Sequence, residues 1–513
     1  MMQKLISITL LLLLFFSANA VGDSQKKAPQ ELDAASVLKE MDEKIHHGEN
    51  IYYDNKTIIG NLDFGLLNLS VENDSNESGS EICTKRAFPY EMRIINSRIV
   101  GSVLCNGTCF LEPVDLEKTT FIGNVRFDNS KFRNCIDLSG AIFSGSSNFV
   151  ASYFTGGIIC RDTSFDDVVF DGSTVGLSAT FARSYFRDAS FKGVQFFCSD
   201  ADFGNCEFKE LIDFSSSQFR PLPNFMGSKF QGDAIFIGTN FSKGSDFSNI
   251  TFDSIVDYSD AIFNKMRADF RDTRFNNYAI FRNATFKGDA FFDNSRFSND
   301  AFFDNAVLSQ HVSLKQTNYQ KFYTRWKNLA DSLNYDDEAY LSLIENYKNL
   351  GWFEDANDCY YKYRCEYRRA NYDFPPPSLR ELNEGLKNYI SQWQLFFMNL
   401  LFYWIPDSIF MGINGYGVMP SRPLFWMLLT ISLFGIIFWF TDSIPFWSAM
   451  KFSVVVFLSG SGKLFVEAPD YKPNPKSTPH LATFSIIMFY LERILGMIIF
   501  IALLVAFGKT VLR

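Results

Sequence analysis

The stretch ATFKGDAFFDNSRF, residues 284–297, shows the pattern that decides the fold of most of this chain. Large aromatic residues recur every five or six positions, and small or polar residues fill the positions between them. The longest uninterrupted run of this ladder contains Phe208, Phe214, Phe219, Phe225, Phe230, Phe236, Phe241, Phe247, Phe252, Tyr258 and Phe263. A helix needs a period of about 3.6 residues, so the spacing predicts a coiled stack of short strands with inward-pointing rings.

The ladder continues in both directions. After one seven-residue step it resumes with Phe270, Phe275, Phe281, Phe286, Phe292, Phe297, Phe303 and Leu308, and looser copies run back to Phe121. The repeat resembles the pentapeptide-repeat family in its Phe-centred variety, over residues 95–308. The resemblance implies a right-handed quadrilateral β-helix, here with about eight to nine coils of about 22 residues each. Stacked rings would then supply the core.

The N-terminal part has the features of an exported protein. Residues 1–20 combine Lys4, an apolar run and a small-x-small ending at Ala20, which predicts a signal peptide; an uncleaved anchor is the alternative. Residues 21–94 contain a predicted helix followed by the first strands, which is similar to the N-terminal cap of extracytoplasmic pentapeptide-repeat proteins from methanogenic archaea. Eight N-x-S/T sequons all lie before residue 284. We therefore expect the repeat domain to lie outside the cytoplasm.

Nine cysteines precede the apolar C-terminal region: Cys83, Cys105, Cys109, Cys135, Cys160, Cys198, Cys206, Cys359 and Cys365. In an oxidising compartment some of them are expected to pair. Zinc is the alternative for Cys105/Cys109 and Cys359/Cys365, but the four His residues offer no second half-site, so we predict no metal. We predict no cofactor either.

The composition argues against two classes of function. The net charge is −9, from 48 basic and 57 acidic residues, whereas a nucleic-acid surface needs a basic stripe. The Asp residues recur at solvent-facing repeat positions rather than in a catalytic groove. No nucleophile–base pair, phosphate loop or metal constellation occurs at useful spacing, so we do not expect an enzyme.

Residues 309–392 read as a helical linker. From about Asn318 apolar residues recur at i, i+3/i+4 and i+7, which predicts several amphipathic helices up to about residue 374. The stretch from Tyr340 to Tyr363 resembles a tetratricopeptide-like helical hairpin. It could cap the solenoid or form a peptide-binding groove. Pro375, Pro376 and Pro377 end the helical pattern.

The last 121 residues, 393–513, are the membrane region. Residues 424–440 form an uncharged apolar run with Trp near both ends, and a second run extends from about Ile494 to Arg513. Glu492 and Arg493 are expected at one interface and Lys509 and Arg513 at the other. A third segment, 393–423, either spans the membrane or lies flat in its interface.

The segment 424–513 resembles the two-transmembrane pore of the potassium-channel superfamily. Between the two runs, residues 445–465 read as a short helix followed by a glycine turn, which predicts a re-entrant loop. The second run opens with E-x-x-x-G, formed by Glu492 and Gly496. The resemblance implies a homotetramer and gives Gly496 a packing or gating role.

The filter position departs from the family. FLSGSGKLF, residues 457–465, stands where potassium filters read T-V-G-Y-G-D. The candidate filter residues are Leu458, Ser459, Gly460, Ser461, Gly462 and Lys463. The glycines are kept, but Leu458 replaces the threonine and Lys463 replaces the outer acidic residue. A ring of four Lys463 ammonium groups repels cations, so potassium selectivity is not expected.

The leading hypothesis is a multi-pass membrane protein that joins an extracytoplasmic solenoid to an ion-channel-like pore of unknown selectivity. Its expected partners are the lipid bilayer, other copies of the same chain and an unidentified surface ligand, but no nucleic acid. The alternative is a non-conducting, membrane-anchored scaffold or binding protein in which the pore region serves only for anchoring and assembly.

Overall fold

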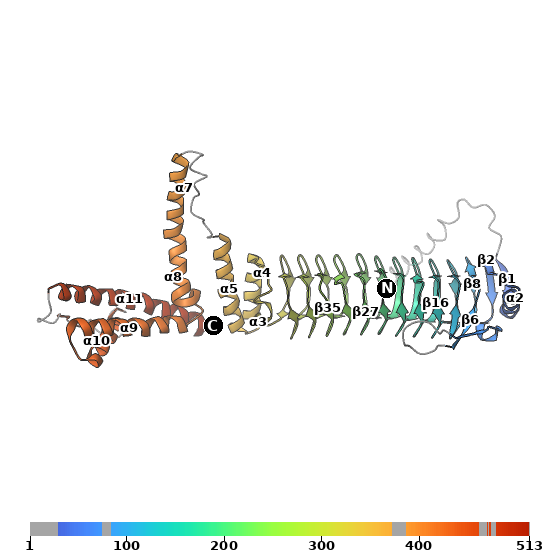
Figure 1. The fold of residues 1–513 in the computed structure, drawn as a ribbon, viewed down its shortest axis with the longest axis horizontal. Helices are drawn as coiled ribbons and strands as arrows, with labels where there is room; N and C mark the ends of the chain where they lie inside the picture. The colour runs from blue at the N-terminus through green and yellow to red at the C-terminus, as the bar shows by residue number, and fades with distance from the viewer. Residues whose placement is uncertain are drawn as a thin grey trace, which may run out of the picture. The chain divides into compact units, whose positions relative to one another are not determined.

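The structure, a computed structural model, describes residues 29–73, 84–371, 386–460, 469, 471–472 and 479–511. The chain divides into two compact units, Met1–Thr324 and Arg325–Arg513. Figure 1 shows that the first is a stack of short strands and the second is helical. The predicted signal peptide lies outside the described residues.

Each coil of the stack has four short sides. One coil consists of β33 (Thr251–Phe252), β34 (Val256–Asp257), β35 (Ile262–Phe263) and β36 (Ala268–Asp269). The next strand, β37 (Arg274–Phe275), lies parallel to β33 and places Phe275 beside Phe252. Strands from two sides merge into one 22-stranded sheet, while the other two sides form 12-stranded sheets. The predicted quadrilateral β-helix is therefore confirmed.

The solenoid is longer than the sequence predicted. Its strands begin with β1 (Gln30–Asp33) and end with β46 (Phe322–Tyr323). The cap region supplies coils of its own, and strands continue beyond residue 308. Two of the sheets hold 12 strands each, so the expectation of eight to nine coils was too low. β45 (Asn318–Tyr319) and β46 also occupy residues that were expected to begin the helices.

Aromatic rings fill the interior in four columns, one for each side. Phe247 is fully buried and stacks on Phe225 and Phe270, with ring centroids 5.0 and 5.3 Å apart. Edge-on contacts to Phe236 and Phe241, at 5.4 and 5.7 Å, join neighbouring columns. Offset stacks and edge-on pairs at these distances are the favourable arrangements of aromatic rings. The prediction that the repeated Phe residues point inward is confirmed.

Buried hydroxyl groups link successive coils beside the rings. Thr239 Oγ1 donates to the carbonyl oxygen of Phe214 at 2.8 Å, and Thr273 Oγ1 donates to that of Phe247 at 2.7 Å. Cys206 takes the same place, with its Sγ 3.0 Å from the carbonyl oxygen of Phe181. These bonds give the buried hydroxyl and thiol groups hydrogen-bond partners inside a core that water does not reach.

The expectation that cysteines pair as disulfides is wrong for seven of the described residues, which are free thiols: Cys105, Cys135, Cys160, Cys198, Cys206, Cys359 and Cys365. Cys105, Cys160 and Cys206 are buried at inward positions of the stack, where neighbouring coils carry other core side chains. Cys83 lies outside the described residues.

The predicted N-terminal helix is confirmed as α2 (Ala34–His47), which strands β2 (Ile51–Asp54), β3 (Lys56–Ile59) and β4 (Leu62–Asp63) follow. Asp33 caps the helix by accepting a hydrogen bond from the backbone N–H of Ser36 at 3.2 Å. The buried face of α2 contains Ala34, Val37, Leu38 and Met41.

The helical unit begins with α3 (Trp326–Leu329), α4 (Asp337–Asn349) and α5 (Phe353–Asn371). α4 and α5 form the predicted hairpin, which buries Tyr340, Tyr347, Ala356 and Cys359. The remaining elements are α7 (Leu386–Asn399), the π-helical turn η2 (Leu400–Trp404), α8 (Ile405–Asn414), the short turn η3 (Gly415–Gly417), α9 (Ser421–Asp442), α10 (Phe446–Ser459) and α11 (Pro479–Val511).

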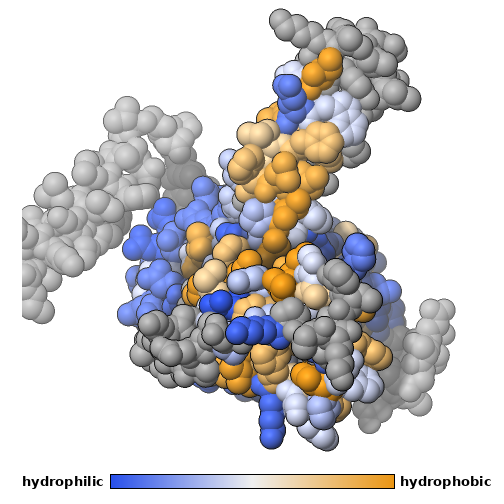
Figure 2. All heavy atoms as spheres, turned by 90° about the vertical axis from the view of Figure 1, so that its left-hand side faces the viewer, coloured by the Kyte–Doolittle hydropathy of each residue, from blue (hydrophilic) through white to orange (hydrophobic). Residues whose placement is uncertain are grey.

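Three helical segments of the described chain are long and apolar enough to cross a membrane: Ile390–Gly417, Ser421–Asp442 and His480–Gly508. Figure 2 shows hydrophobic side chains spread over the outer surface of these helices. Exposed side chains include Phe402 on η2, Phe440 on α9 and Leu504 on α11. An exposed apolar surface of this extent is typical of a protein that contacts lipid.

Candidate functional site

The C-terminal helices α9 and α11 form a hairpin, and the short helix α10 packs against it. α9 has 22 residues and α11 has 33, whereas α10 has only 14. At a rise of about 1.5 Å per residue, α10 is about 21 Å long and cannot cross a hydrocarbon core of about 30 Å. α10 packs against both long helices.

A small apolar core holds the three helices together. It consists of Phe434 and Phe438 from α9, Ala449 and Val456 from α10, and Phe489 from α11. The ring of Phe438 meets that of Phe452 edge-on at 5.0 Å. These contacts fix which face of α10 turns toward the hairpin.

One serine joins all three helices through polar contacts. Ser453 on α10 donates to a side-chain oxygen of Glu492 on α11 and lies 2.9 Å from the carbonyl oxygen of Ile431 on α9. Glu492 is fully buried, and its second carboxyl oxygen has no hydrogen-bond partner within the described chain. A buried carboxyl group costs free energy unless it is hydrogen-bonded. The bond from Ser453 to Glu492 therefore stabilises the packing of α10 on α11.

The position of Glu492 corrects the sequence-based expectation. Glu492 and Arg493 were expected at a membrane interface because the second apolar run was taken to begin near Ile494. The helix in fact begins at Pro479, so both residues lie near its middle. Their neighbours are protein side chains: Ser453 bonds Glu492, and the Arg493 guanidinium lies 5.9 Å from the centre of the Phe489 ring.

Two of the predicted site residues, Gly460 and Gly496, meet where α10 ends. A β-carbon added to Gly496 would lie 2.4 Å from the carbonyl oxygen of Phe457, and one added to Gly460 would lie 2.2 Å from that of Arg493. Both distances are shorter than any ordinary contact, so only glycine permits this approach of the two backbones.

The other candidate filter residues are placed as follows. Leu458 is half-buried at the end of α10, and Ser459 is buried with its hydroxyl 2.7 Å from the carbonyl oxygen of Val456. Ser461, Gly462 and Lys463 lie outside the described residues. The structure therefore describes the start of the predicted filter but not its centre.

A second polar cluster lies at the C-terminal end of α9, around Asp442. The sequence analysis did not predict it. The carboxylate of Asp442 accepts hydrogen bonds from Tyr471 at 2.8 Å and from Ser485 at 3.1 Å. The ring of Tyr471 also stacks on Phe489, with centroids 4.9 Å apart. Tyr471 thus contacts both long helices, α9 through Asp442 and α11 through Phe489. Its only sequence signal is one aromatic residue in a polar, proline-rich stretch.

The segment α7–α8 differs from the two long helices. Both α7 and α8 have one apolar and one more polar face, whereas α9 and α11 are apolar all round. In Figure 1, α7 and α8 run crosswise to α9 and α11. An amphipathic helix is suited to the membrane interface, and a uniformly apolar one to the membrane interior.

Helix α5 of the α4/α5 hairpin contacts α8, which is the C-terminal part of the α7–α8 segment. Arg364 on α5 pairs with Asp407 on α8 at 3.0 Å, and Arg422 at the start of α9 bonds the hydroxyl of Tyr361 on α5 at 3.0 Å. Tyr416 in η3 donates to Asp407 at 2.7 Å. Helix α5 therefore lies beside the start of α9, at one end of the hairpin formed by α9 and α11.

Within the described part of the chain, no group of three or more His, Cys, Asp or Glu residues is arranged to hold a metal ion. Comparison with protein families gave one match. The model for pentapeptide repeats (9 copies) matches residues 106–152, 127–175 and 270–318. These parts of the solenoid thus consist of pentapeptide repeats. Searches of curated proteins and of solved structures found no match.

Proposed function

We propose that this pentapeptide-repeat protein is inserted in a membrane and forms an ion-conducting pore from four copies, with its solenoid outside the cytoplasm. The observation that carries the proposal is α10, a helix too short to cross the membrane that packs against two helices long enough to do so. A channel needs such an element because it places backbone carbonyl groups inside the membrane without exposing them to lipid.

The contacts of α10 support this role. Ser453 and the glycine pair Gly460/Gly496 fix both the rotation and the depth of α10 against α11. The residues that follow, beginning at Gly460, would line a path shared by four copies. Because Lys463 would add four positive charges to its rim, we do not propose potassium selectivity.

We further propose that α9 and α11 cross the bilayer while α7–α8 lies in its interface. The amphipathic character of α7–α8 supports this arrangement, and so do its contacts with α5. If α7–α8 crossed the membrane, α5 would have to lie on the opposite face from the start of α9, and the bond between Tyr361 and Arg422 could not form. The segment between α10 and α11 then faces the side opposite the solenoid.

Labelling of single cysteines with a membrane-impermeant maleimide tests this topology. We would place them at the exposed positions Glu354, Ser421 and Lys472, in a chain whose Cys83, Cys135 and Cys365 are replaced by serine, so that the remaining described cysteines are buried. On intact cells we expect positions 354 and 421 to react and position 472 to react only after permeabilisation. Protection of 421 beside reactive 354 and 472 would show a third span. Protection of 354 would place the solenoid in the cytoplasm.

A non-conducting membrane scaffold is the second candidate function. The observation that favours it is the filter sequence, in which Leu458 and Lys463 replace the threonine and the acidic residue of potassium filters. In a scaffold, α10 and its contacts would serve only assembly.

Currents in planar bilayers under a KCl gradient separate the two functions. A pore predicts current from the wild-type protein and, for Lys463→Glu, a reversal potential shifted toward cation selectivity, because four charges on the rim change sign. The matched control is Lys451→Glu on α10, which precedes the filter. No current from a protein confirmed as an oligomer would contradict the pore and leave the scaffold.

A further inference from the structure

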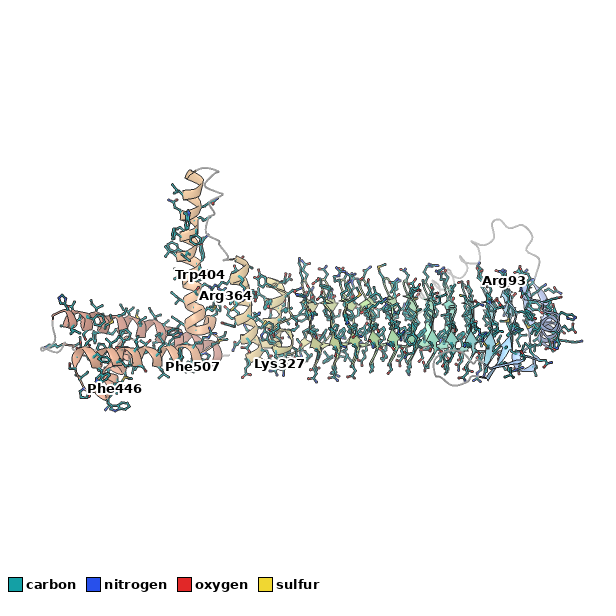
Figure 3. The ribbon with its side chains drawn as sticks, viewed as in Figure 1. Arg93, Lys327, Arg364, Trp404, Phe446 and Phe507 are labelled. Atoms are coloured by element: carbon teal, nitrogen blue, oxygen red, sulfur yellow. The ribbon has the colours of Figure 1, made fainter. Side chains whose placement is uncertain are left out.

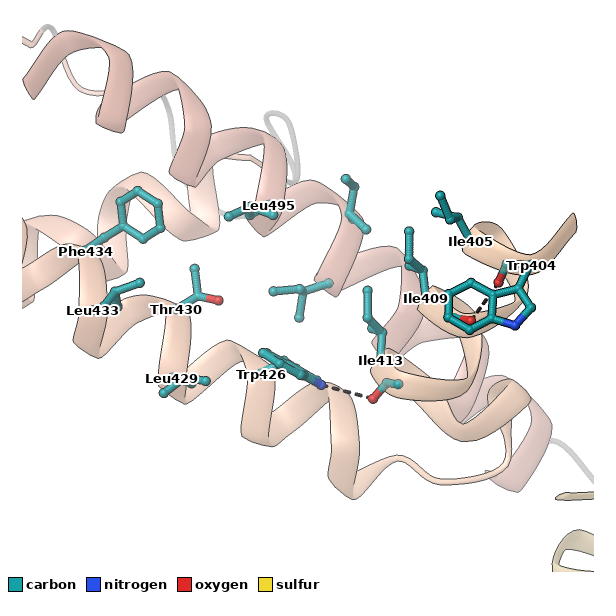
Figure 4. Close-up of a pocket in the computed structure, with 14 residues that line it drawn as sticks. Trp404, Ile405, Ile409, Ile413, Trp426, Leu429, Thr430, Leu433, Phe434 and Leu495 are labelled. Carbon is teal, nitrogen blue, oxygen red and sulfur yellow. Dashed lines mark hydrogen bonds between the residues drawn. The ribbon is translucent and has the colours of Figure 1, made fainter. Parts of the chain in front are cut away.

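An apolar groove opens between α8, α9 and α11 on the surface of the helical unit (Figure 4). Its volume is about 520 Å³, within the range of about 300–1,000 Å³ that ligand sites occupy. The walls come mostly from aliphatic side chains and two tryptophans: Ile409, Leu433, Leu495, Ile498, Trp404 and Trp426. The Trp426 indole N–H donates to the carbonyl oxygen of Gly412 at 3.0 Å.

Three arginines gather at the end of the groove where α5 meets α8. The Arg368 guanidinium lies 4.8 Å from the centre of the Trp404 ring, which is part of the groove wall. Arg422 donates to the carbonyl oxygen of Met411, the neighbour of the groove residue Gly412. Arg364 pairs with Asp407 on α8 at 3.0 Å, and Figure 3 labels both Arg364 and the groove residue Trp404.

The three arginines carry three positive charges, and the one carboxylate that pairs with them, Asp407, carries a single negative charge. Arg364 and Arg368 share Asp407, at 3.0 and 4.0 Å, while the two acceptors of Arg422 are uncharged oxygens. The buried Nε of Arg364 has no hydrogen-bond partner in the described structure. Arginine binds phosphate oxygens through its fork of donors, and tryptophan favours the level of the lipid headgroups.

We propose that this groove binds one anionic phospholipid, with the phosphate at Arg364, Arg368 and Arg422 and an acyl chain along the walls formed by α9 and α11. A second copy of the chain could cover the apolar walls, but it would not explain the charge excess at one end. The inference needs insertion in a membrane and not ion conduction, so a failure of the current measurement leaves it standing.

Binding can be measured on the full chain in detergent by native mass spectrometry with added phosphatidylglycerol or phosphatidylcholine. The wild type should bind phosphatidylglycerol more tightly. Arg368→Gln should weaken this binding about fivefold, since one arginine near a charged headgroup contributes roughly that factor. The control is Arg369→Gln on the same helix, whose partner is Glu366 at 2.9 Å, and it should leave the affinity unchanged.

Gly412→Leu tests the groove itself. A β-carbon at Gly412 meets no atom within 4 Å, and Gly412 lines the groove, so a leucine at this position projects into the groove. We expect it to lower the binding of phosphatidylglycerol. Equal binding of the two lipids by the wild type, equal effects of the two arginine variants, or unchanged binding to Gly412→Leu would each overturn the proposal. A disulfide cross-link between copies through Gly412→Cys would show that protein fills the groove, and would also overturn it.

Discussion

The contact between α10 and α11 makes opposite predictions for two glycines of the same helix. In Gly496→Ala the new β-carbon would lie 2.4 Å from the Phe457 carbonyl oxygen and 3.1 Å from its carbon, so the two backbones must separate. In Gly508→Ala the β-carbon meets no atom within 4 Å. Both substitutions bring the same gain in helix propensity, up to about 1 kcal/mol.

The expected magnitudes follow from these contacts. Overpacking costs about 1–3 kcal/mol, and a contact of 2.4 Å with a backbone oxygen belongs at the upper end, so Gly496→Ala should lower the free energy of unfolding by about 2 kcal/mol after the propensity gain. Gly508→Ala should leave it unchanged or raise it by up to about 1 kcal/mol. Denaturant unfolding of the full chain in detergent, followed by tryptophan fluorescence, measures both. An unchanged or increased stability of Gly496→Ala, beside a normal Gly508→Ala, would refute the close contact.

Three further predictions concern the polar bridge, the ring columns and the thiols. Ser453→Ala leaves the Glu492 carboxyl buried without its donor and should cost about 1–3 kcal/mol of stability in the same unfolding assay, whereas Glu492→Gln keeps an acceptor and should cost less. Phe247→Ala removes a fully buried ring and should cost about 3–5 kcal/mol, against under 1 kcal/mol for the conservative change at its surface neighbour, Ser248→Thr. Burial raises the pKa of the Cys135 and Cys198 thiols to about 11, so their thiolate fraction at pH 8 is about one in a thousand. Alkylation followed by mass spectrometry should therefore modify them slowly at pH 8 and about a hundredfold faster at pH 10; rapid modification at pH 8 would contradict their burial.

The solenoid could be predicted because its signal is local. Each coil places an aromatic ring inside and polar residues outside. The step of five or six residues therefore shows where each strand lies and which of its side chains point inward. The spacing of aromatic residues did not reveal the full length of the solenoid, because the coils at its two ends carry aliphatic residues at several of the inward positions. Ile58, Ile99 and Val312 are buried there without the aromatic marker.

The helical site could be predicted only in part. The glycines at 460 and 496 were recognised one by one, but their contact depends on the register between α10 and α11, which no local pattern encodes. Glu492 illustrates the same limit. A charged residue beside an apolar run suggests an interface, and only its partner Ser453, which is 39 positions earlier in another helix, shows that it is buried.

The proposed pore requires four copies around one path, because a single chain supplies only one α10. The number of copies in the purified particle tests this most directly, and native mass spectrometry of the full chain in a mild detergent measures it. The account predicts a complex of four chains that persists on dilution. A monomer that retains its fold, at every concentration and in every detergent tried, would contradict it.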